Sequence, residues 1–545
     1  MVSITIYGGA DEIGGNKILV ESQGTRVMLD FGTRMGFESK FFSEFVKARS
    51  NTGLRDRLIL GSLPLIPGIY RANMIRPSGL DEVESEGRVL TEDSKLLDFK
   101  GLVTYEDYVD KCGRGYLDAM FLSHAHFDHV GDMNCVHPDI PLYCSSTTKL
   151  MVEAVDELTN FKSQAISMKR PEIAFGKSGS FADKPKLNKK NKSERDCFTL
   201  EEGRIISIGS MKIRAIKIDH SVPGANSFVL DADGKRILYT GDIRFHGTFP
   251  LSIDDYVELV GKDINVMICE GTRIDSDSLI TEEMVRERMV EEMKEVEGLV
   301  FVDFSWKDTT RYETIRRACE ECDRVFVINA RLAFLLNLLN EKPDMEKVKV
   351  FLKRKGSALY SPADYSRSKY EYGYSVDKED LDSSHYENGL TALDIIKEPG
   401  KYVLMFSYYD LNQLFDFADS DGVIPGSRFI KAQCEPFSDD MALDEERLIN
   451  WLEMLDIDFK EGEPEVPEDC KNPGCEKIKR VIDRSHVSGH ASRPELKEMI
   501  AKLKPDVLMP VHTLDPGEFK RIAEELEKEH RIKVIPPKRG KTYEL

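Results

Sequence analysis

The sequence has no apolar run approaching the roughly 18 residues that cross a bilayer, which excludes a membrane-spanning protein. It also has no basic segment followed by a long apolar stretch at its start, where MVSITIYGG leads straight into strand-like sequence. No secretory signal is visible, so a cytoplasmic location is predicted. The ten cysteines are scattered, mostly in apolar stretches, and form neither a disulfide framework nor a four-ligand zinc site.

An excess of positive charge is also missing, because 76 Lys and Arg stand against 96 Asp and Glu, giving a formal net charge of −20. This balance excludes binding of nucleic acid through a globally basic surface and leaves a local basic channel open. Residues 177–195, KSGSFADKPKLNKKNKSER, hold several lysines among Ser, Asn, Gly and Pro. That composition indicates a solvated loop first and a phosphate-contacting arm second.

The length of 545 residues exceeds one ordinary core, so more than one domain is expected. The opening segments SITIYGG, KILVES and RVMLDFG predict consecutive antiparallel strands. Residues 33–116 show little clear hydrophobic periodicity of a helix or a strand, and they are treated as an insertion of unknown purpose. Near Glu270 the pattern changes to helices that alternate with apolar strands such as LVFVDF and RVFVIN, which predicts a parallel sheet covered by helices. Short β/α units return from about Arg480.

The segment SHAHFDH, which ends at His129, follows the predicted strand LDAMFLS. On extended backbone His124 and His126 point the same way, while Asp128 and His129 project from the next turn. Imidazole and carboxylate together suit zinc, and a shared carboxylate suits a metal pair about 3.5 to 4 Å apart. Three of the eleven histidines fall in this segment, which favours a metal site over an ordinary polar turn.

Two further strand ends carry side chains of the same kind. His220 ends the strand-like KIRAIKID, and Asp242 follows RILYTG in a Thr-Gly-Asp turn. Alone, His220 would be interpreted as a surface or core histidine and Asp242 as a turn residue. Together with HAHFDH they predict one metal centre at the ends of strands.

The segment HVSGHAS offers a second kind of site, one for anions. Ser492 and Glu495 form an S-x-x-E capping box, and Pro494 lies in the first turn, which predicts a helix start. The free N–H groups and the dipole of such a helix attract anions. An ordinary capped helix fits these residues about equally well, and only the order of the motifs favours phosphate binding. The loop residues before this helix include His486, Ser488, Gly489 and His490.

HAHFDH, then HSVPGA, then YTGDIRFHG resemble the metallo-β-lactamase superfamily. The opening GGADEIGGN and the segments TGDIRF, HVSGHAS and LMPVHT are similar to the ribonucleases J, nucleases of the β-CASP branch. The resemblance implies an α/β fold, a metallo-β-lactamase αββα sandwich with an inserted β-CASP domain whose parallel sheet is flanked by helices. The chain is similar to the short archaeal form of these ribonucleases, which is without the C-terminal domain of the bacterial members.

The same resemblance implies three segments and a set of functional residues. The metallo-β-lactamase domain would comprise residues 1–273, with the insertion at about 33–116, and residues 480–545, and the β-CASP domain residues 274–479. One metal would be held by His124, His126 and His220, the other by Asp128, His129 and His512, with Asp242 as the bridge. Catalytic roles fall to Asp128, Asp242, Glu270 as a residue that orients a ligand, and His490 as general acid or phosphate clamp. Phosphate contacts fall to His486, Ser488, Gly489 and Ser492.

The implied reaction is hydrolysis of single-stranded RNA by a hydroxide that two Zn²⁺, or Mn²⁺ in their place, activate. The implied mode is that of a 5′-to-3′ exonuclease in RNA processing or decay. Three alternatives stay open: a β-CASP endonuclease of the 3′-end processing type, a small-molecule metallohydrolase, and a non-catalytic RNA-binding scaffold. Glu270, where ribonucleases J usually have Asp, mildly favours the endonuclease. The sequence allows a homodimer without requiring one.

Two departures from the family pattern concern the end of the motif series and the insertion. His512 is followed by Thr513 and Leu514, where family members usually have Gly and Glu. The insertion at about 33–116 is longer than expected. These differences bear on substrate selection and oligomeric state more than on the metal site.

Overall fold

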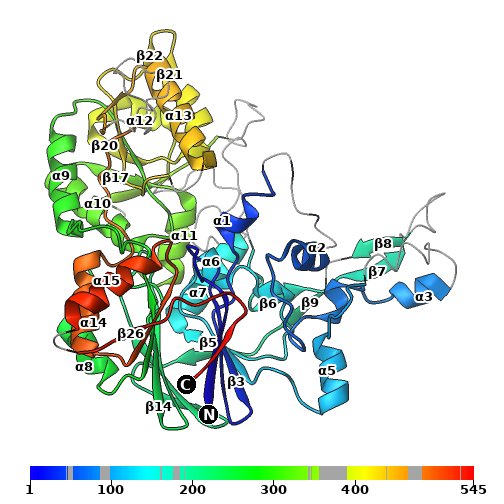
Figure 1. The fold of residues 1–545 in the computed structure, drawn as a ribbon. Helices are drawn as coiled ribbons and strands as arrows, with labels where there is room; N and C mark the ends of the chain where they lie inside the picture. Colours follow the sequence, from blue (N-terminus) through cyan, green and yellow to red (C-terminus); the bar gives the residue numbers. More distant parts are fainter. Residues whose placement is uncertain are drawn as a thin grey trace, which may run out of the picture.

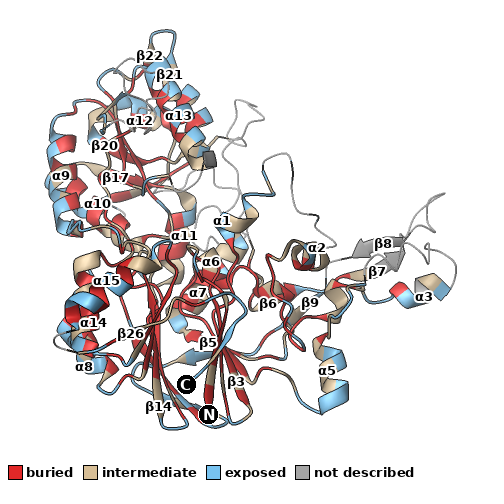
Figure 2. Cartoon of the chain, viewed as in Figure 1, coloured by how far each residue is buried: buried red, intermediate tan, exposed pale blue. Residues whose placement is uncertain are grey.

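Three seven-stranded sheets form the framework of the protein in the computed structural model (Figure 1). The structure describes residues 1–43, 46, 49, 53–85, 98–159, 162–175, 185–188, 191–341, 344, 346–354, 389–436, 439–463, 481–527 and 530–545. Buried residues are concentrated in the strands of the three sheets and in the helix faces turned towards them (Figure 2).

The first sheet contains the predicted β opening. In order across the sheet its strands are β10 (Cys197–Leu200), β5 (Leu142–Ser145), β4 (Ala119–Phe121), β3 (Thr25–Leu29), β2 (Lys17–Ser22), β1 (Val2–Gly8) and β27 (Thr542–Glu544). The antiparallel pairing of β1 with β2 and of β2 with β3 confirms the expected start. Helix α7 (Ser146–Leu158) covers the outer face through Met151 and Val152, and the short helix α6 (Phe127–Val130) follows β4.

The second sheet packs face to face against the first. Its strands are, in order, β11 (Ile205–Ile208), β12 (Met211–Lys217), β13 (Asn226–Ala232), β14 (Lys235–Tyr239), β15 (Val266–Glu270), β25 (Val507–Val511) and β26 (Lys533–Val534). A shared apolar core, to which Ile4 and Phe228 belong, lies between the sheets. Helices α8 (Ile253–Val260), α14 (Arg493–Leu503) and α15 (Pro516–Leu526) cover the outer face. This order of layers confirms the predicted αββα fold.

The third sheet is parallel and is built from residues 300–459 alone. Its strands are, in order, β19 (Gly389–Leu390), β18 (Val348–Phe351), β17 (Val325–Ile328), β20 (Tyr402–Met405), β16 (Val300–Asp303), β23 (Arg428–Lys431) and β24 (Asp458–Phe459). Helices α9 (Glu282–Lys294), α10 (Thr309–Glu321), α11 (Ala330–Leu338), α12 (Ala392–Lys397) and α13 (Asp439–Met454) accompany it. Such β/α alternation was expected after Glu270, whereas the domain limits at 273/274 and 479/480 stay predictions.

Helix α9 begins at Glu282, directly after Thr281. The Thr281 side chain accepts a hydrogen bond from the Met284 amide at 3.2 Å and so caps the helix.

Among the described residues, no helix combines the length and the apolar character that crossing a bilayer requires.

The insertion at about 33–116 contributes α1 (Met35–Glu38), α2 (Gly53–Leu60), α3 (Leu80–Ser85) and α5 (Tyr105–Cys112). Buried Asp132 ties this insertion to the domain. Its carboxylate lies 2.8 Å from Lys17 Nζ, accepts a hydrogen bond from Thr33 Oγ1 at 2.6 Å, and pairs with Arg57 of α2. In the predicted lysine-rich loop at 177–195, residues 177–184, 189 and 190 lie outside the described residues. The loop prediction is wrong for two short parts of the rest, because each pairs with an antiparallel strand: β8 (Pro185–Asn188) with β7 (Glu172–Phe175), and β9 (Lys192–Glu194) with β6 (Ser167–Lys169).

Candidate metal centre

The HAHFDH turn is held by backbone bonds from two neighbouring loops. His126 is extended, with φ −69° and ψ 147°, and immediately precedes α6, which carries Asp128 and His129. The Gly15 amide donates to the Asp128 carbonyl at 2.9 Å, and the Phe31 amide donates to the His129 carbonyl at 2.8 Å. The change from extended to helical backbone lets the four donor side chains of one short segment point into a single space.

Two glycines let the chain pass close to Asp128. A Cβ on Gly14, where φ is 72°, would lie 2.3 Å from Asp128 Oδ2. A Cβ on Gly32 would lie 1.6 Å from the Asp128 carbonyl oxygen. Neither position accepts a larger residue unless the ligand turn moves.

The first group of donors consists of three imidazoles and one carboxylate. His126 Nδ1 lies 3.1 Å from His124 Nε2 and 3.0 Å from His220 Nε2. Asp242 Oδ2 lies 3.5 Å from His124 Nε2 and 3.8 Å from His220 Nε2. All four donor atoms lie within 4.8 Å of one another. This spacing suits a tetrahedral site for one ion.

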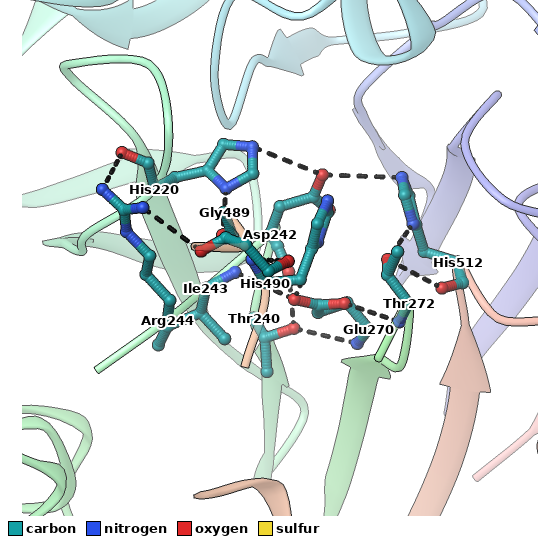
Figure 3. A network of polar contacts seen from close by, with 12 residues as sticks. His220, Thr240, Asp242, Ile243, Arg244, Glu270, Thr272, Gly489, His490 and His512 are labelled. Carbon is teal, nitrogen blue, oxygen red and sulfur yellow. Dashed lines mark hydrogen bonds and ion pairs between the residues drawn. The ribbon is translucent and has the colours of Figure 1, made fainter. Parts of the chain in front are cut away.

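The second group shares Asp242 with the first. His512 Nε2 lies 3.1 Å from Asp128 Oδ2, and His129 Nε2 lies 3.9 Å from the same oxygen. Asp242 Oδ2 lies 3.1 Å from His129 Nε2 and 3.5 Å from His512 Nε2. The structure thus brings all seven predicted ligands together, with the Asp242 carboxylate between the two groups. Figure 3 shows Asp242 between His220 and His512.

Hydrogen bonds on the outer side of the rings set the tautomers of the first group. The Gly489 carbonyl accepts from His220 Nδ1 at 2.5 Å. Ser123 Oγ donates to Asp30 Oδ2 at 2.7 Å and lies 3.0 Å from His124 Nδ1, so it accepts from that ring nitrogen. The Nε2 lone pairs of both histidines therefore face the centre.

The same arrangement is found in the second group. Asp30 Oδ2 accepts from His129 Nδ1 at 2.8 Å. Thr272 Oγ1 lies 2.8 Å from His512 Nδ1 and donates to the His512 carbonyl at 3.3 Å, which leaves the hydroxyl oxygen to accept from the ring (Figure 3). Again Nε2 of each ring faces the centre.

Burial and the two carboxylates determine the charges at the site. Burial, followed by neighbouring imidazoles, lowers the pKa of His124 and of His220 well below the usual value, so both rings are neutral. Burial would also lower the pKa of His129, but Asp242 and Asp128 outweigh it and raise that pKa well above the usual value. A metal at the second group must therefore displace a proton from His129, which makes its binding stronger as pH rises.

Two buried atoms support the fit of metal ions to these residues. Among the described residues, His129 Nε2 and Asp242 Oδ1 are buried and have no hydrogen-bond partner. Both atoms belong to side chains whose other polar atoms are engaged or face the donor groups. Unpaired buried atoms are costly in a protein without a ligand for them, and a cation between imidazole and carboxylate donors supplies that ligand.

Asp30 is a residue of the centre that the sequence interpretation missed. It follows β3 with φ 57°, is 1% exposed, and accepts hydrogen bonds from the Ser123 amide at 2.7 Å and the Tyr239 hydroxyl at 2.6 Å in addition to those from Ser123 Oγ and His129. The sequence did contain a signal for Asp30. It stands at the end of a predicted strand, in LDFG, and His220 and Asp242 occupy the same kind of position.

We expect Asp30→Ala to weaken metal binding and stability together. The substitution leaves the buried Ser123, Tyr239 and His129 donors without their acceptor, which costs about 2–3 kcal/mol in the free energy of unfolding. Loss of the partner of His129 should lower metal affinity by about 10- to 100-fold. Thermal unfolding and competition with a chelator measure the two effects. Asp231→Ala is the control, because the Asp231 side chain is 43% exposed near the end of β13 and pairs with Arg236, outside the centre. Unchanged affinity in Asp30→Ala would contradict the role.

Glu270 and His490 lie beside the second group. Glu270 is fully buried, and its Oε1 accepts from His490 Nδ1 at 3.1 Å and from the Ile243 amide at 3.2 Å. Its Oε2 accepts from the Thr272 amide at 2.9 Å (Figure 3). A donor atom of His490 lies within 4.8 Å of those of Asp242 and His512. Glu270 therefore fixes the His490 ring and, through Thr272, the His512 ring.

The HVSGHAS loop is held by its own side chains and by the buried Arg244. Ser492 is 3% exposed, and its amide and hydroxyl donate to Glu495 at 2.9 and 3.0 Å, so the capping box forms as predicted. The Ser488 carbonyl accepts from Arg244 at 3.2 Å, and the Ser488 hydroxyl accepts from the His490 amide at 3.1 Å. The phosphate contacts expected of His486, Ser488, Gly489 and Ser492 stay predictions.

Two domain families match the chain. The Beta-lactamase superfamily domain covers residues 113–300, which hold His124, His126, Asp128, His129, His220 and Asp242. The Zn-dependent metallo-hydrolase RNA specificity domain covers residues 477–537, which hold His490 and His512. The chain therefore contains a domain of the metallo-β-lactamase superfamily. The second description names a Zn-dependent metallo-hydrolase, in agreement with the metal-dependent hydrolase that the motifs led us to expect.

Two proteins named Ribonuclease J are similar to this chain. The one from Sinorhizobium meliloti (strain Sm2011 / Rm2011 / 2011) is 23% identical over 415 residues, covering 73% of this chain and 58% of the relative. The one from Pyrococcus abyssi (strain GE5 / Orsay) is 22% identical over 539 residues, covering 96% of this chain and 91% of the relative. The chain thus spans less than two thirds of the first relative. These matches confirm the resemblance to the ribonuclease J group.

A solved structure shares the fold over its whole length. The crystal structure of a protein of unknown function from Enterococcus faecalis V583 aligns with a TM-score of 0.64 and 19% identity, and the alignment covers 100% of both chains. At 19% identity this structural similarity shows a common fold alone.

Proposed function

We propose that the protein is a zinc-dependent ribonuclease that hydrolyses the phosphodiester bonds of single-stranded RNA. The observation that carries this proposal is the joint placement of seven donors for two metal ions with the His490–Glu270 pair beside them. The RNA specificity domain over residues 477–537 and the two relatives named Ribonuclease J support RNA as the substrate class. Imidazole and carboxylate donors suit Zn²⁺, and Mn²⁺ is the alternative.

The side chains would divide between two ions. His124, His126 and His220 would hold one ion, Asp128, His129 and His512 the other, and Asp242 would be shared. When bound, two such ions lower the pKa of water and neutralise charge on a phosphodiester. The chain itself contributes the orientation of the rings, fixed by Asp30, Thr272 and the Gly489 carbonyl.

His490 would supply the proton for the leaving oxygen. Its Nδ1 is engaged by Glu270, so Nε2 is the ring atom available to a substrate. A buried carboxylate behind the ring holds the ring in one orientation. The alternative role, a clamp that donates a hydrogen bond to a phosphate oxygen, uses the same atom.

The proposed mode is 5′-to-3′ exonucleolytic cleavage that prefers a 5′-monophosphate. The support is the similarity of the HVSGHAS segment to that of the ribonucleases J and its place at the start of α14, beside the donor groups. A cytoplasmic location, a homodimer and the three segment limits given above are retained as predictions.

One RNA prepared in three forms tests the mode. We expect mononucleotides to be released from the linear 5′-monophosphate, little product from the 5′-triphosphate, and none from the circle. Product sizes from 5′- and 3′-labelled RNA give the measurement. Equal cutting of the circle would show that a free end is unnecessary, in favour of an endonuclease of the 3′-end processing type. Hydrolysis of simple thioesters without cutting of RNA would favour a small-molecule hydrolase.

A further inference from the structure

His246 lies in the loop that follows β14, and its side chain is 7% exposed. Its Nδ1 lies 3.0 and 2.9 Å from the two carboxylate oxygens of Glu495, and its Nε2 lies 3.0 Å from the Ser488 carbonyl oxygen. Its own carbonyl accepts from the Glu282 amide, at the start of α9, at 3.4 Å. His246 is therefore bonded to the HVSGHAS loop, to helix α14 and to a helix of the third sheet.

The two contacts of the His246 ring determine its charge. The Ser488 carbonyl can only accept a hydrogen bond, and the Glu495 carboxylate already accepts two, from the amide and the hydroxyl of Ser492. Burial would raise the pKa of Glu495, but the hydrogen bond and the charge of His246 outweigh burial and lower that pKa. A neutral imidazole donates through one nitrogen only, so it would point a lone pair at one of these acceptors. The imidazolium donates through both nitrogens and satisfies both.

The Ser488 carbonyl is the point through which His246 acts on the loop that carries His490. The same peptide group contains the Gly489 amide, and the Ser488 hydroxyl accepts from the His490 amide at 3.1 Å. The loop packs closely here, because a Cβ on Gly489 would lie 2.8 Å from Ser221 Oγ. The position of the Ser488 peptide group therefore sets the position of the His490 backbone.

Other charged groups surround His246. Arg244 donates to the same Ser488 carbonyl at 3.2 Å and pairs with Asp219 at 3.1 Å. His246 also lines a cavity with charged residues of α9 and α10, which are Glu282, Glu283, Arg286 and Arg317. Burial would raise the pKa of Glu282, but neighbouring arginines lower it, as Arg286 does for Glu283. Burial raises the pKa of Asp219, and the charge of Arg244 opposes that rise. Guanidinium groups keep their charge, so an imidazole is the group of this set that loses a proton on the alkaline side of neutrality.

We propose that His246, as an imidazolium, is a positioning residue that holds the loop of His490 in place for hydrolysis. The inference rests on phosphodiester hydrolysis as the proposed function. Both hydrogen bonds of the ring are present while it is protonated, and loss of the proton as pH rises removes one of them. The hold on the loop is therefore complete at acid pH and weaker at alkaline pH, where Arg244 alone still donates a charged bond to the Ser488 carbonyl.

The test compares His246→Gln and His246→Arg in the metal-loaded full chain. Arginine keeps a charge and several donors, whereas the glutamine oxygen would face one of the two acceptors. We expect His246→Gln to lower kcat on RNA by about 10- to 100-fold with both metal ions retained, and His246→Arg to recover most of the rate. His137→Gln is the matched control, because His137 is 16% exposed, lies 3.5 Å from Glu106 and stacks on Tyr105 of α5.

The pH profile tests the charge of the ring. The ratio of kcat between the wild type and His246→Arg cancels every pH effect that the two proteins share. We expect this ratio to fall between about pH 6 and about pH 9, because only the wild-type ring loses a proton in that range. A ratio that is constant over the whole range would overturn the proposal.

A second comparison tests whether His246 acts through His490. In a His490→Ala background, His246→Gln should lower kcat by less than about 2-fold further, because residues that act as a unit are not additive. A full additional loss would contradict the proposal, and so would an unchanged rate in His246→Gln alone. Loss of metal from His246→Gln would also contradict it, because His246 would then support the ligand set through Gly489.

The protonation state of the ring can be measured without a substrate. We expect the long-range ¹⁵N–¹H spectrum of the wild type at about pH 6 to show both nitrogens of His246 protonated, with His246→Gln identifying the signal. A ring protonated on one nitrogen only would overturn the inference. If the wild type does not cleave RNA, the ribonuclease proposal fails, while this spectrum still decides the charge of His246.

Discussion

Replacing Asp242 by alanine is expected to empty the metal centre and to abolish hydrolysis. Asp242 Oδ2 is the one carboxylate oxygen that approaches members of both donor groups, at 3.1 Å from His129 Nε2 and 3.5 Å from His124 Nε2. Its removal leaves three donors at each ion and no bridge between the ions. It also removes the charge that keeps the pKa of His129 high and that balances two cations in a buried site.

Elemental analysis after dialysis measures the expected loss of metal, and RNA cleavage measures the activity. Asp254→Ala is the matched control, because Asp254 is 79% exposed on α8 and pairs only with Lys502 at 2.7 Å among the described residues. Near-wild-type metal content in Asp242→Ala would remove it from the ligand set. Circular dichroism of the variant distinguishes loss of metal from loss of the fold.

The sequence was sufficient to predict the ligands because they stand in short patterns at strand ends. HAHFDH sets four donors by local geometry, and the alternation of helices and strands after Glu270 set the parallel sheet. The hydrogen-bond partners of the ligands could not be predicted in the same way. Asp30 and His129 are 99 residues apart, and Thr272 and His512 are 240 residues apart. Only the pairing of strands that are distant in the chain, β3 with β4 and β15 with β25, brings them together.

The contacts of the third-sheet helices with the segment before the HVSGHAS loop could not be predicted from the sequence either. Glu282 and Arg311 both fall in amphipathic patterns of the sequence. Charged residues in such a pattern are expected on the solvent-exposed face of a helix. In the structure both are buried, because the third sheet packs its helices α9 and α10 against the loop that returns to the first domain. The insertion at 33–116 was unpredictable for a related reason, since its anchor is Asp132 beyond its own limits.

The second large effect is expected from His490→Ala, which should lower kcat on RNA by about 10² to 10⁴ with both metal ions retained. His490 Nδ1 is hydrogen-bonded to Glu270, and His490 belongs to neither of the two groups assigned as metal ligands. Removal of its side chain therefore leaves both ligand sets complete. The measurement is single-turnover cleavage of RNA together with elemental analysis of the same protein.

The choice of leaving group separates the two roles left open for His490. A ribose oxygen leaves as a strong base and needs a proton, whereas p-nitrophenolate leaves readily as an anion. If His490 is the general acid, His490→Ala should be severely impaired on RNA and nearly normal on bis(p-nitrophenyl) phosphate. If it is a phosphate clamp, the rates on both substrates should fall by similar factors. Glu270→Gln should reproduce the pattern of His490→Ala in weaker form, because the amide no longer fixes the ring. A His490→Ala variant as fast as the wild type on RNA would exclude both roles and leave the proton to come from water.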